Sequence, residues 1–267
     1  MTDLDVVALR NAFDSQLRPE APDPVPAGVT VERDGPLVRV RGMFGRGFLT
    51  YRDLDGLRGD ELTALIERQR DHFRQLGEPV EWKHYAHDEP ADLPDRLRAA
   101  GFAPEDEETV VVGPVASLAA TMPVVPDGVR LREVTARADL DRIAAMEEEV
   151  WQADRSHHAG MLESELAAAP DGLTVVVAEE TDGGRVVSAG WIRYERGSSF
   201  ASLWGGATLA QWRGRGIYRA LVVHRARLAD ARGYAFLQVD ASDDSRPILQ
   251  RLGLVAITTT TPYVYTP

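Results

Sequence analysis

The chain has 267 residues, of which 44% are hydrophobic, and its 42 acidic and 30 basic side chains give a formal net charge of -12. Such a length holds one large domain or two small ones, each with a core, and we expect two. The negative field argues against a protein that coats nucleic acid or an anionic membrane. Because the chain has no cysteine, it forms no disulfide, thiolate nucleophile or cysteine-ligated zinc site.

The beginning of the chain does not resemble a signal peptide. Its first apolar runs are short and are broken by acidic residues. No later stretch approaches the roughly 18 consecutive apolar residues that a membrane-spanning helix needs. We therefore expect a cytoplasmic protein.

The first half predicts a sheet with helices. Residues 18–27 are rich in proline and should be extended. Strands are expected over 29–42, around a turn, and over 47–53. The apolar spacing within 59–77 predicts a helix that ends at a glycine. The remaining elements are a strand at 80–85, a helix at 90–100, a strand at 107–113 and a linker over 113–128.

The second half alternates strands with helices. Its expected elements are strand 129–134, helix 138–151, helix 160–169, strands 173–180 and 185–195 around a tight turn, strand 200–209, helix 217–232, strand 235–241, helix 245–252 and strand 255–266. The helix over 217–232 should place His224 on its apolar stripe as a core histidine. This order predicts an α/β fold, or a mixed α+β sheet, with helices on its faces.

The two halves resemble each other. Residues 95–112 align with 247–265, and Gly101 then falls on Gly253. Upstream, a helix, a glycine and a strand recur in the same order in both halves. We interpret this as a duplication, although any chain built of helix, glycine and strand could produce a similarity of this kind.

The stretch QWRGRGIYRAL, residues 211–221, places three arginines and two glycines before a predicted helix. The amides at a helix N-terminus are unpaired, the helix dipole adds positive charge there, and glycine lets the backbone approach a ligand. Arg213 and Arg215 would strengthen such an anion site. The pattern favours a phosphate ligand; the alternative is a tight turn with exposed arginines.

This stretch resembles the pyrophosphate loop of the GCN5-related N-acetyltransferase (GNAT) superfamily, whose pattern is Arg/Gln-x-x-Gly-x-Gly/Ala. Arg213 and Gly216 match it, and Tyr218 stands where the family has glycine or alanine; a register that starts at Gln211 also matches. The resemblance covers residues 127–267, which it identifies as a catalytic domain. Each half should then be a central, mostly antiparallel sheet flanked by helices.

Residues 1–120 resemble a degenerate GNAT-like domain without a cofactor site. Their corresponding loop, DLDGLRGDEL, carries acidic side chains that would repel a pyrophosphate. The chain as a whole thus resembles a tandem GNAT protein.

The resemblance implies that acetyl-coenzyme A is the co-substrate, that no metal is required, and that the acceptor is a primary amine on a small molecule or a peptide. The acidic balance favours a cationic amine. The cofactor residues that the resemblance implies are Ala207, Thr208, Leu209, Arg213, Gly214, Arg215, Gly216, Ile217, Tyr218, Ser242 and Ser245, the two serines being helix caps in the alternative interpretation. Candidate acceptor-binding residues are Trp151, His157, His158 and Trp204. Both a monomer and a homodimer stay open.

The acid that protonates the departing thiolate is not evident. Many family members use a tyrosine on the fourth helix, where this chain has Leu249. Tyr218, Tyr263 and Tyr265 are the alternatives, as is a water molecule.

The general base is equally open. The family often uses an acid on the strand that here spans 200–209, which contains none. Asp240 and Glu149 are the remaining candidates. Because neither the general acid nor the general base is evident, the alternative function is a non-catalytic acyl-coenzyme A-binding sensor or regulatory module.

Overall fold

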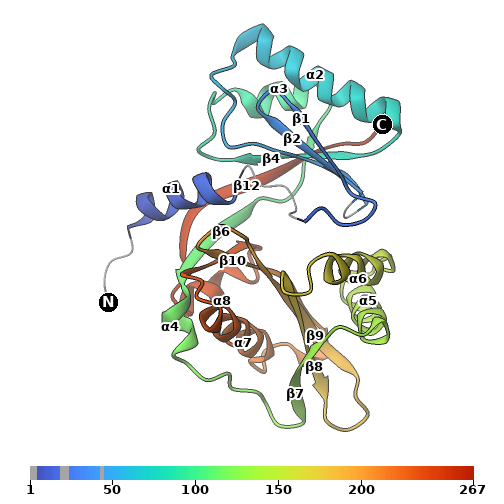
Figure 1. The fold of residues 1–267 in the computed structure, drawn as a ribbon, viewed down its shortest axis with the longest axis vertical. Helices are drawn as coiled ribbons and strands as arrows, with labels where there is room; N and C mark the ends of the chain where they lie inside the picture. The colour runs from blue at the N-terminus through green and yellow to red at the C-terminus, as the bar shows by residue number, and fades with distance from the viewer. Residues whose placement is uncertain (1–4, 19–23, 43–44) are drawn as a thin grey trace. The chain divides into compact units, whose positions relative to one another are not determined.

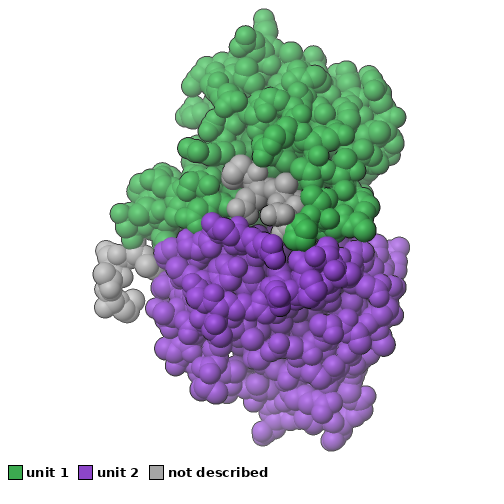
Figure 2. All heavy atoms as spheres, in the orientation of Figure 1, with its two compact units in different colours: residues 1–110, 240–244, 256–267 green, residues 111–239, 245–255 purple. Residues whose placement is uncertain are grey.

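The computed structural model describes residues 5–18, 24–42 and 45–267. Its elements are drawn in Figure 1, and its two compact units are coloured separately in Figure 2. Unit 1 comprises residues 1–110, 240–244 and 256–267, and unit 2 comprises residues 111–239 and 245–255. Residues 19–23 of the segment predicted to be extended lie outside the described residues. No helix among the described residues is both long and apolar enough to cross a membrane.

Unit 1 is a mostly antiparallel sheet with helices. Its elements are α1 (Val6–Gln16), β1 (Thr30–Asp34), β2 (Leu37–Arg41), β3 (Gly47–Thr50), α2 (Gly59–Leu76), β4 (Val80–Tyr85), α3 (Leu93–Ala99), β5 (Ala103–Pro104), the start of β6 (Glu108–Pro114) and most of β12 (Val255–Tyr265). Its strands run in the order β1-β2-β3-β4-β12. Only the β3–β4 pair among these is parallel. Trp82, Phe73 and Tyr263 lie in its apolar core.

Unit 2 has the same kind of architecture. Its elements are the end of β6, α4 (Val115–Ala119), β7 (Val129–Val134), α5 (Arg137–Trp151), α6 (His157–Ala168), β8 (Leu173–Glu180), β9 (Val186–Tyr194), β10 (Phe200–Thr208), α7 (Ile217–Ala231), most of β11 (Phe236–Ala241) and α8 (Arg246–Arg251). Its strands run in the order β6-β11-β10-β9-β8-β7. Figure 1 shows α5 and α6 on one side of the β8–β9 pair and α7 on the other. The prediction of a mixed α/β fold with helices on the faces of the sheet is confirmed.

The two units repeat one pattern of pairing. In unit 1, β3 is antiparallel to β2 and parallel to β4, and α2 connects β3 with β4. In unit 2, β10 is antiparallel to β9 and parallel to β11, and α7 connects β10 with β11. A helical crossover between parallel strands thus recurs at the same place in each unit, as a duplication would leave it.

The final strand of each half contributes to the other half's unit. Residues 256–265 of β12 belong to unit 1, while residues 111–114 of β6 belong to unit 2. The packing units therefore do not coincide with the continuous ranges 1–120 and 127–267. Those ranges stay a prediction about ancestry and activity.

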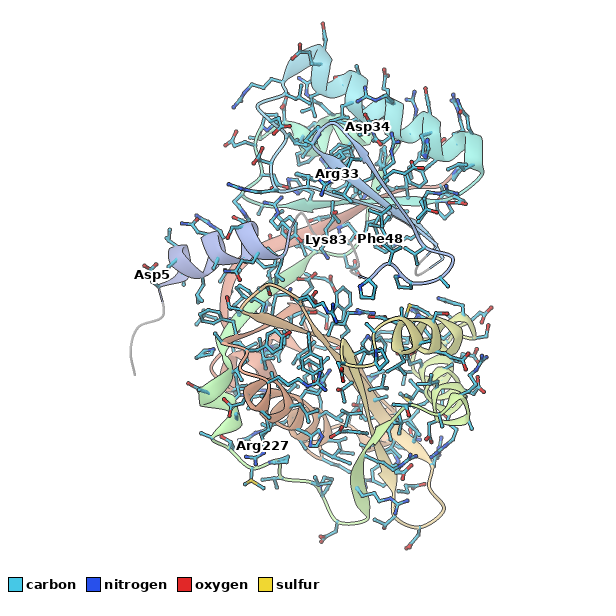
Figure 3. The ribbon with its side chains drawn as sticks, viewed as in Figure 1. Asp5, Arg33, Asp34, Phe48, Lys83 and Arg227 are labelled. Carbon is cyan, nitrogen blue, oxygen red and sulfur yellow. The ribbon has the colours of Figure 1, made fainter. Side chains whose placement is uncertain are left out.

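Two helices were not predicted. The segment 113–128 is not a plain linker, because α4 lies within it and buries Val115 and Leu118. The other is α1, which begins after Asp5, labelled in Figure 3. The Asp5 carboxylate accepts hydrogen bonds from the amides of Val7 and Ala8, as an N-cap does.

Candidate active site

The strand β10 separates from β11 partway along its length. The parallel ladder joins Phe200 through Ser202 to Phe236 through Gln238 and stops there. β10 continues to Thr208 and stays paired with β9. Residues 203–208 therefore present a strand edge without a β11 ladder, about 20 Å long at the usual rise of a strand. Such an edge offers backbone donors and acceptors to a ligand.

A bulge marks this separation. The register of β10 on β9 shifts between Gly205 and Ala207. Gly205 and Gly206 both have a positive φ, of 71° and 81°. A Cβ atom on Gly205 would lie 2.5 Å from the Trp191 ring, and one on Gly206 would lie 2.8 Å from Cε2 of Tyr218. Both the backbone conformation and the two rings thus require glycine at the bulge.

The loop after β10 leads into the N-terminus of α7. Gly214 and Gly216 have φ values of 75° and 84°, and no atom lies within 4 Å of a Cβ built on either. Gly216 is the N-cap of α7, and no side chain caps the helix. The first amides of α7 are accordingly available to an anion, and the two glycines leave it room. The residues present fit a diphosphate.

The two arginines of the loop flank this helix end. Nε of Arg213 donates to the carbonyl of Thr208 at 3.1 Å, which ties the loop to the end of β10. The Arg215 guanidinium lies over the ring of Trp212, 4.5 Å from its centroid. Neither arginine has a carboxylate partner among the ion pairs of the described chain, so their charge is available to an anion.

The predicted cofactor residues on β10 are ordered by a neighbouring serine. The hydroxyl of Ser188 lies 2.7 Å from the carbonyl of Ala207, to which it donates, and 2.8 Å from the hydroxyl of Thr208. The amide of Leu209 donates to the carbonyl of Val187. Ser245 precedes α8 within unit 2, whereas Ser242 belongs to unit 1. The structure thus brings every predicted cofactor residue except Ser242 into one unit.

No protein-family model matches the sequence, and no curated protein is similar to it. Solved structures do resemble it. A GCN5-related N-acetyltransferase from Kribbella flavida has a TM-score of 0.66 at 14% identity, over 98% of this chain and 96% of that one. The chain has a GNAT fold. A tandem GNAT protein from the clavulanic acid biosynthesis pathway has a TM-score of 0.64 at 15% identity, over 97% and 94%. A GCN5-related N-acetyltransferase from Sphaerobacter thermophilus has a TM-score of 0.56 at 17% identity, over 88% and 81%.

The three tyrosines considered for the general acid are divided between the two units. Tyr263 is 3% exposed in the core of unit 1, and Tyr265 of the same unit packs on Phe102. Tyr218 belongs to unit 2 and lies against the bulge. Burial raises the pKa of Tyr218, although its hydrogen bond with Ser245 and the charge of Arg225 act in the opposite direction. The phenol is therefore protonated at neutral pH.

Position 249, where the GNAT pattern has its tyrosine, cannot supply the general acid. Leu249 is fully buried on α8. An apolar side chain cannot donate a proton, so the chain has no acid at this position. Tyr218 is the tyrosine among the three alternatives that shares a unit with the edge of β10 beyond its ladder with β11.

The two candidate bases are both held in ion pairs. Oδ2 of Asp240 accepts from Nζ of Lys83, labelled in Figure 3, at 2.6 Å within unit 1. Burial alone would lower the pKa of Lys83, but the charge of Asp240 and its neighbours outweighs burial and raises it. Glu149 accepts from Arg185 at 2.7 Å and is about half exposed. Each carboxylate thus already contacts a cationic side chain, and both residues stay predictions for the base.

Three of the four candidate acceptor residues gather at Trp191. The ring of His158 lies 6.5 Å from that of Trp191 and 4.5 Å from that of His157. Trp204 is the cross-strand partner of Trp191 and is 40% exposed. Both histidines lie in the first turn of α6, which begins three residues earlier than predicted. Trp151 is 56% exposed and ends α5, a different helix from the one that carries the histidines.

His158 contacts a buried acidic side chain. Nδ1 of His158 lies 2.7 Å from Oε2 of Glu147, a buried carboxylate on α5. Burial lowers the pKa of His157, and the neighbouring His158 adds to this effect. No group of three or more metal-ligating side chains forms within the described part of the chain. The cluster combines aromatic rings with one buried acid beside β10.

The sequence interpretation missed Arg225 on α7. It placed His224 on the buried stripe, but His224 is half-buried and lies 3.4 Å from Glu133. Arg225 is the buried residue, with 1% exposure. Ile217, Leu221 and Arg225 follow each other at a spacing of four, so an arginine on the apolar stripe was the signal that could have found it.

Proposed function

We propose that the chain is an N-acetyltransferase that transfers an acetyl group from acetyl-coenzyme A to a primary amine, and that unit 2 holds the cofactor. The observation that carries this proposal is the edge of β10 beyond its ladder with β11, which is followed directly by the uncapped N-terminus of α7. One end of this arrangement suits a diphosphate, and the other suits an extended chain of amides. Coenzyme A has both parts in that order.

The residues of the loop and of β10 would divide the binding between them. The amides at the start of α7, with Arg213 and Arg215, attract the diphosphate locally although the chain as a whole is acidic. The edge over 203–208 can pair with amides of the pantetheine arm, as an added strand would. Backbone N–H groups at the bulge would then polarise the thioester carbonyl.

Tyr218 is our candidate for the acid. As the amine nitrogen bonds to the carbonyl carbon, the carbon–sulfur bond breaks and its electron pair goes to sulfur. Tyr218 donates its phenolic proton to the sulfur and is reprotonated from solvent, while the nitrogen loses its extra proton to water. The ring already lies against Gly206, next to the edge where the thioester would lie.

The acceptor is proposed to lie over the cluster of His157, His158 and Trp204. The aromatic faces can contact the carbon chain or the cationic head of an amine. A cationic amine would also be attracted by the net charge of -12. Unit 1 is proposed to take no cofactor, because the loop before α2 is followed by Asp60 and Glu61 in the first turn of that helix.

Calorimetry with coenzyme A, followed by an assay of thiol release from acetyl-coenzyme A on a panel of amines, tests the proposal. The charge reversals Arg213→Glu and Arg215→Glu together should abolish uptake. Arg196→Glu with Arg251→Glu is the matched control, because both of these arginines are exposed in unit 2 and the charge change is equal.

The outcomes separate the two candidate functions. If the unaltered protein takes up no coenzyme A, or if the loop variant binds it as well as the control, the proposal is wrong. Uptake without thiol release on any amine would favour the acyl-coenzyme A sensor instead, for which the burial of Leu249 is the supporting observation.

A further inference from the structure

Arg225 is a fully buried arginine that donates hydrogen bonds to backbone carbonyls. It is 1% exposed, and none of the ion pairs among the described residues includes it. Nη1 donates to the carbonyls of Trp191 and Trp204, each at 3.0 Å, and Nε donates to that of Leu221 at 3.1 Å. Burial lowers the pKa of Arg225 to about 10, which leaves the guanidinium charged at neutral pH.

The burial of this charge opposes folding. An ion that leaves water without a counter-ion loses several kcal/mol of solvation, of which neutral carbonyls restore only a part. An apolar side chain of similar length, such as methionine, would fill the space without that loss. We therefore look for a role of the charge and of the guanidinium N–H groups other than packing.

The carbonyls that accept from the guanidinium lie beside the bulge of β10. Trp204 directly precedes the bulged glycines, and Trp191 is its register partner on β9. One nitrogen of Arg225 thus binds carbonyls from both strands at the point where their register shifts. A Cβ on Gly190, the partner of Gly205, would lie only 2.7 Å from Nη1, so a larger residue there would displace the guanidinium.

We propose that Arg225 is a positioning residue, which holds the β10 bulge through the carbonyls of Trp191 and Trp204 and so keeps the edge over 203–208 aimed at the acyl group. The inference rests on the proposed function and assigns to α7 a second task beyond its N-terminus. The guanidinium contacts the carbonyl of Trp204 on this edge, so its charge would add positive potential where the thioester oxygen gains negative charge. Its effect should therefore be on the acyl group and the transition state, not on the diphosphate.

The test compares free coenzyme A with a stable acetyl-coenzyme A analogue, in which a methylene group replaces the sulfur, by calorimetry on the full chain. In Arg225→Met, affinity for free coenzyme A should stay within about threefold, because the loop at the start of α7 is unchanged. The preference for the acetylated analogue should be lost. Loss of one donor to the oxyanion lowers kcat by about 100-fold or more; because Arg225 is proposed to orient such a donor at the bulge, kcat should fall toward that order while KM changes little.

Arg225→Lys is the second variant, because it keeps the charge but not the planar fork. It should fold, and its kcat and its preference for the analogue should lie between those of Arg225→Met and the unaltered protein. Arg18→Met is the matched control: Arg18 is also buried, but it pairs with Asp88 in unit 1 at 2.5 Å. It should lose stability without any change in the preference for the analogue.

The outcomes distinguish this inference from the proposed function. If the unaltered protein binds no coenzyme A, the proposed function fails and the inference fails with it. If coenzyme A binds and Arg225→Met keeps both the preference and kcat, only the inference is wrong. Should Arg225→Met not fold, an Arg225→Lys variant indistinguishable from the unaltered protein would overturn it, as would an equal loss of preference in Arg18→Met.

Discussion

A fragment that ends at residue 126 should not fold, although it contains the whole predicted N-terminal domain. Unit 1 takes residues 256–267 from the far end of the chain. Within it, β12 pairs with β4 at six positions from Thr260 to Tyr265, and Tyr263 is 3% exposed in the core. Loss of this strand would leave one edge of β4 unpaired and remove part of the core around Trp82.

The expected loss is comparable with the stability of the unit. At about 1 kcal/mol for each hydrogen bond, the pairing with β4 contributes about 6 kcal/mol. Loss of a buried aromatic side chain adds about 3 kcal/mol. A domain of this size is stable by only about 5–15 kcal/mol, so the fragment should lack a cooperative transition.

Urea denaturation followed by near-ultraviolet circular dichroism measures this directly. The matched control is a fusion that joins residues 256–267 to the same fragment through a flexible linker, and it should recover a cooperative transition. A fragment 1–126 that unfolds cooperatively by itself would refute the reasoning and would support the continuous domain ranges. A fusion without a transition would show that residues 240–244 are also needed.

Three further predictions follow from single side chains. Gly206→Ala should lower the free energy of unfolding by about 1–3 kcal/mol and weaken coenzyme A binding, because φ is 81° and the new Cβ would lie 2.8 Å from Tyr218; unchanged urea denaturation and calorimetry would contradict it. Tyr218→Phe should lower kcat for thiol release with little change in coenzyme A affinity, and an unaltered kcat would remove Tyr218 as the acid. Hydrogen bonds from Arg132, followed by those from Arg142 and Arg130, lower the pKa of Glu179 to about 2 despite its burial, so its contribution to stability is complete above the ordinary glutamate pKa of about 4.3 and is lost as pH falls toward 2. Glu179→Gln should therefore flatten the acid limb of stability between those values, and equal acid limbs in thermal unfolding would contradict this.

Local patterns were sufficient for most elements and for placing the loop that we propose to bind the cofactor. The helix at 59–77 and the strands from 173 to 209 follow from apolar periodicity and from glycine positions, which act within a few residues. The loop after β10 was found in the same way, because its glycines and arginines are adjacent. The exchange of final strands left no such signal, since β6 and β12 have apolar patterns that suit a place in either sheet.

The candidate catalytic residues depended on partners far away in the chain. Asp240 and Lys83 are 157 positions apart, and no local pattern predicts that they form an ion pair. The confusion of His224 with Arg225 has a different cause. The apolar stripe of a helix is wide enough to include neighbouring positions, and hydrophobicity ranks an arginine last among candidates for burial. Arg225 is buried nevertheless, because the carbonyls of Trp191 and Trp204 beside the bulge accept its hydrogen bonds.

The charge of the chain bears on the two proposed substrates in opposite ways. Coenzyme A carries phosphates, which a net charge of -12 repels at long range, whereas a cationic amine is attracted. At 0.15 M salt, however, charges separated by more than about 8 Å are largely screened. The diphosphate would then be held by contacts within that distance, from the α7 amides, Arg213 and Arg215, so the acidic surface costs little affinity for the cofactor. The same screening confines the attraction of a cationic acceptor to acidic side chains within that distance of it, so this attraction acts at the acceptor site. An acidic protein with one short basic loop can thus bind an anionic donor and collect a cationic acceptor.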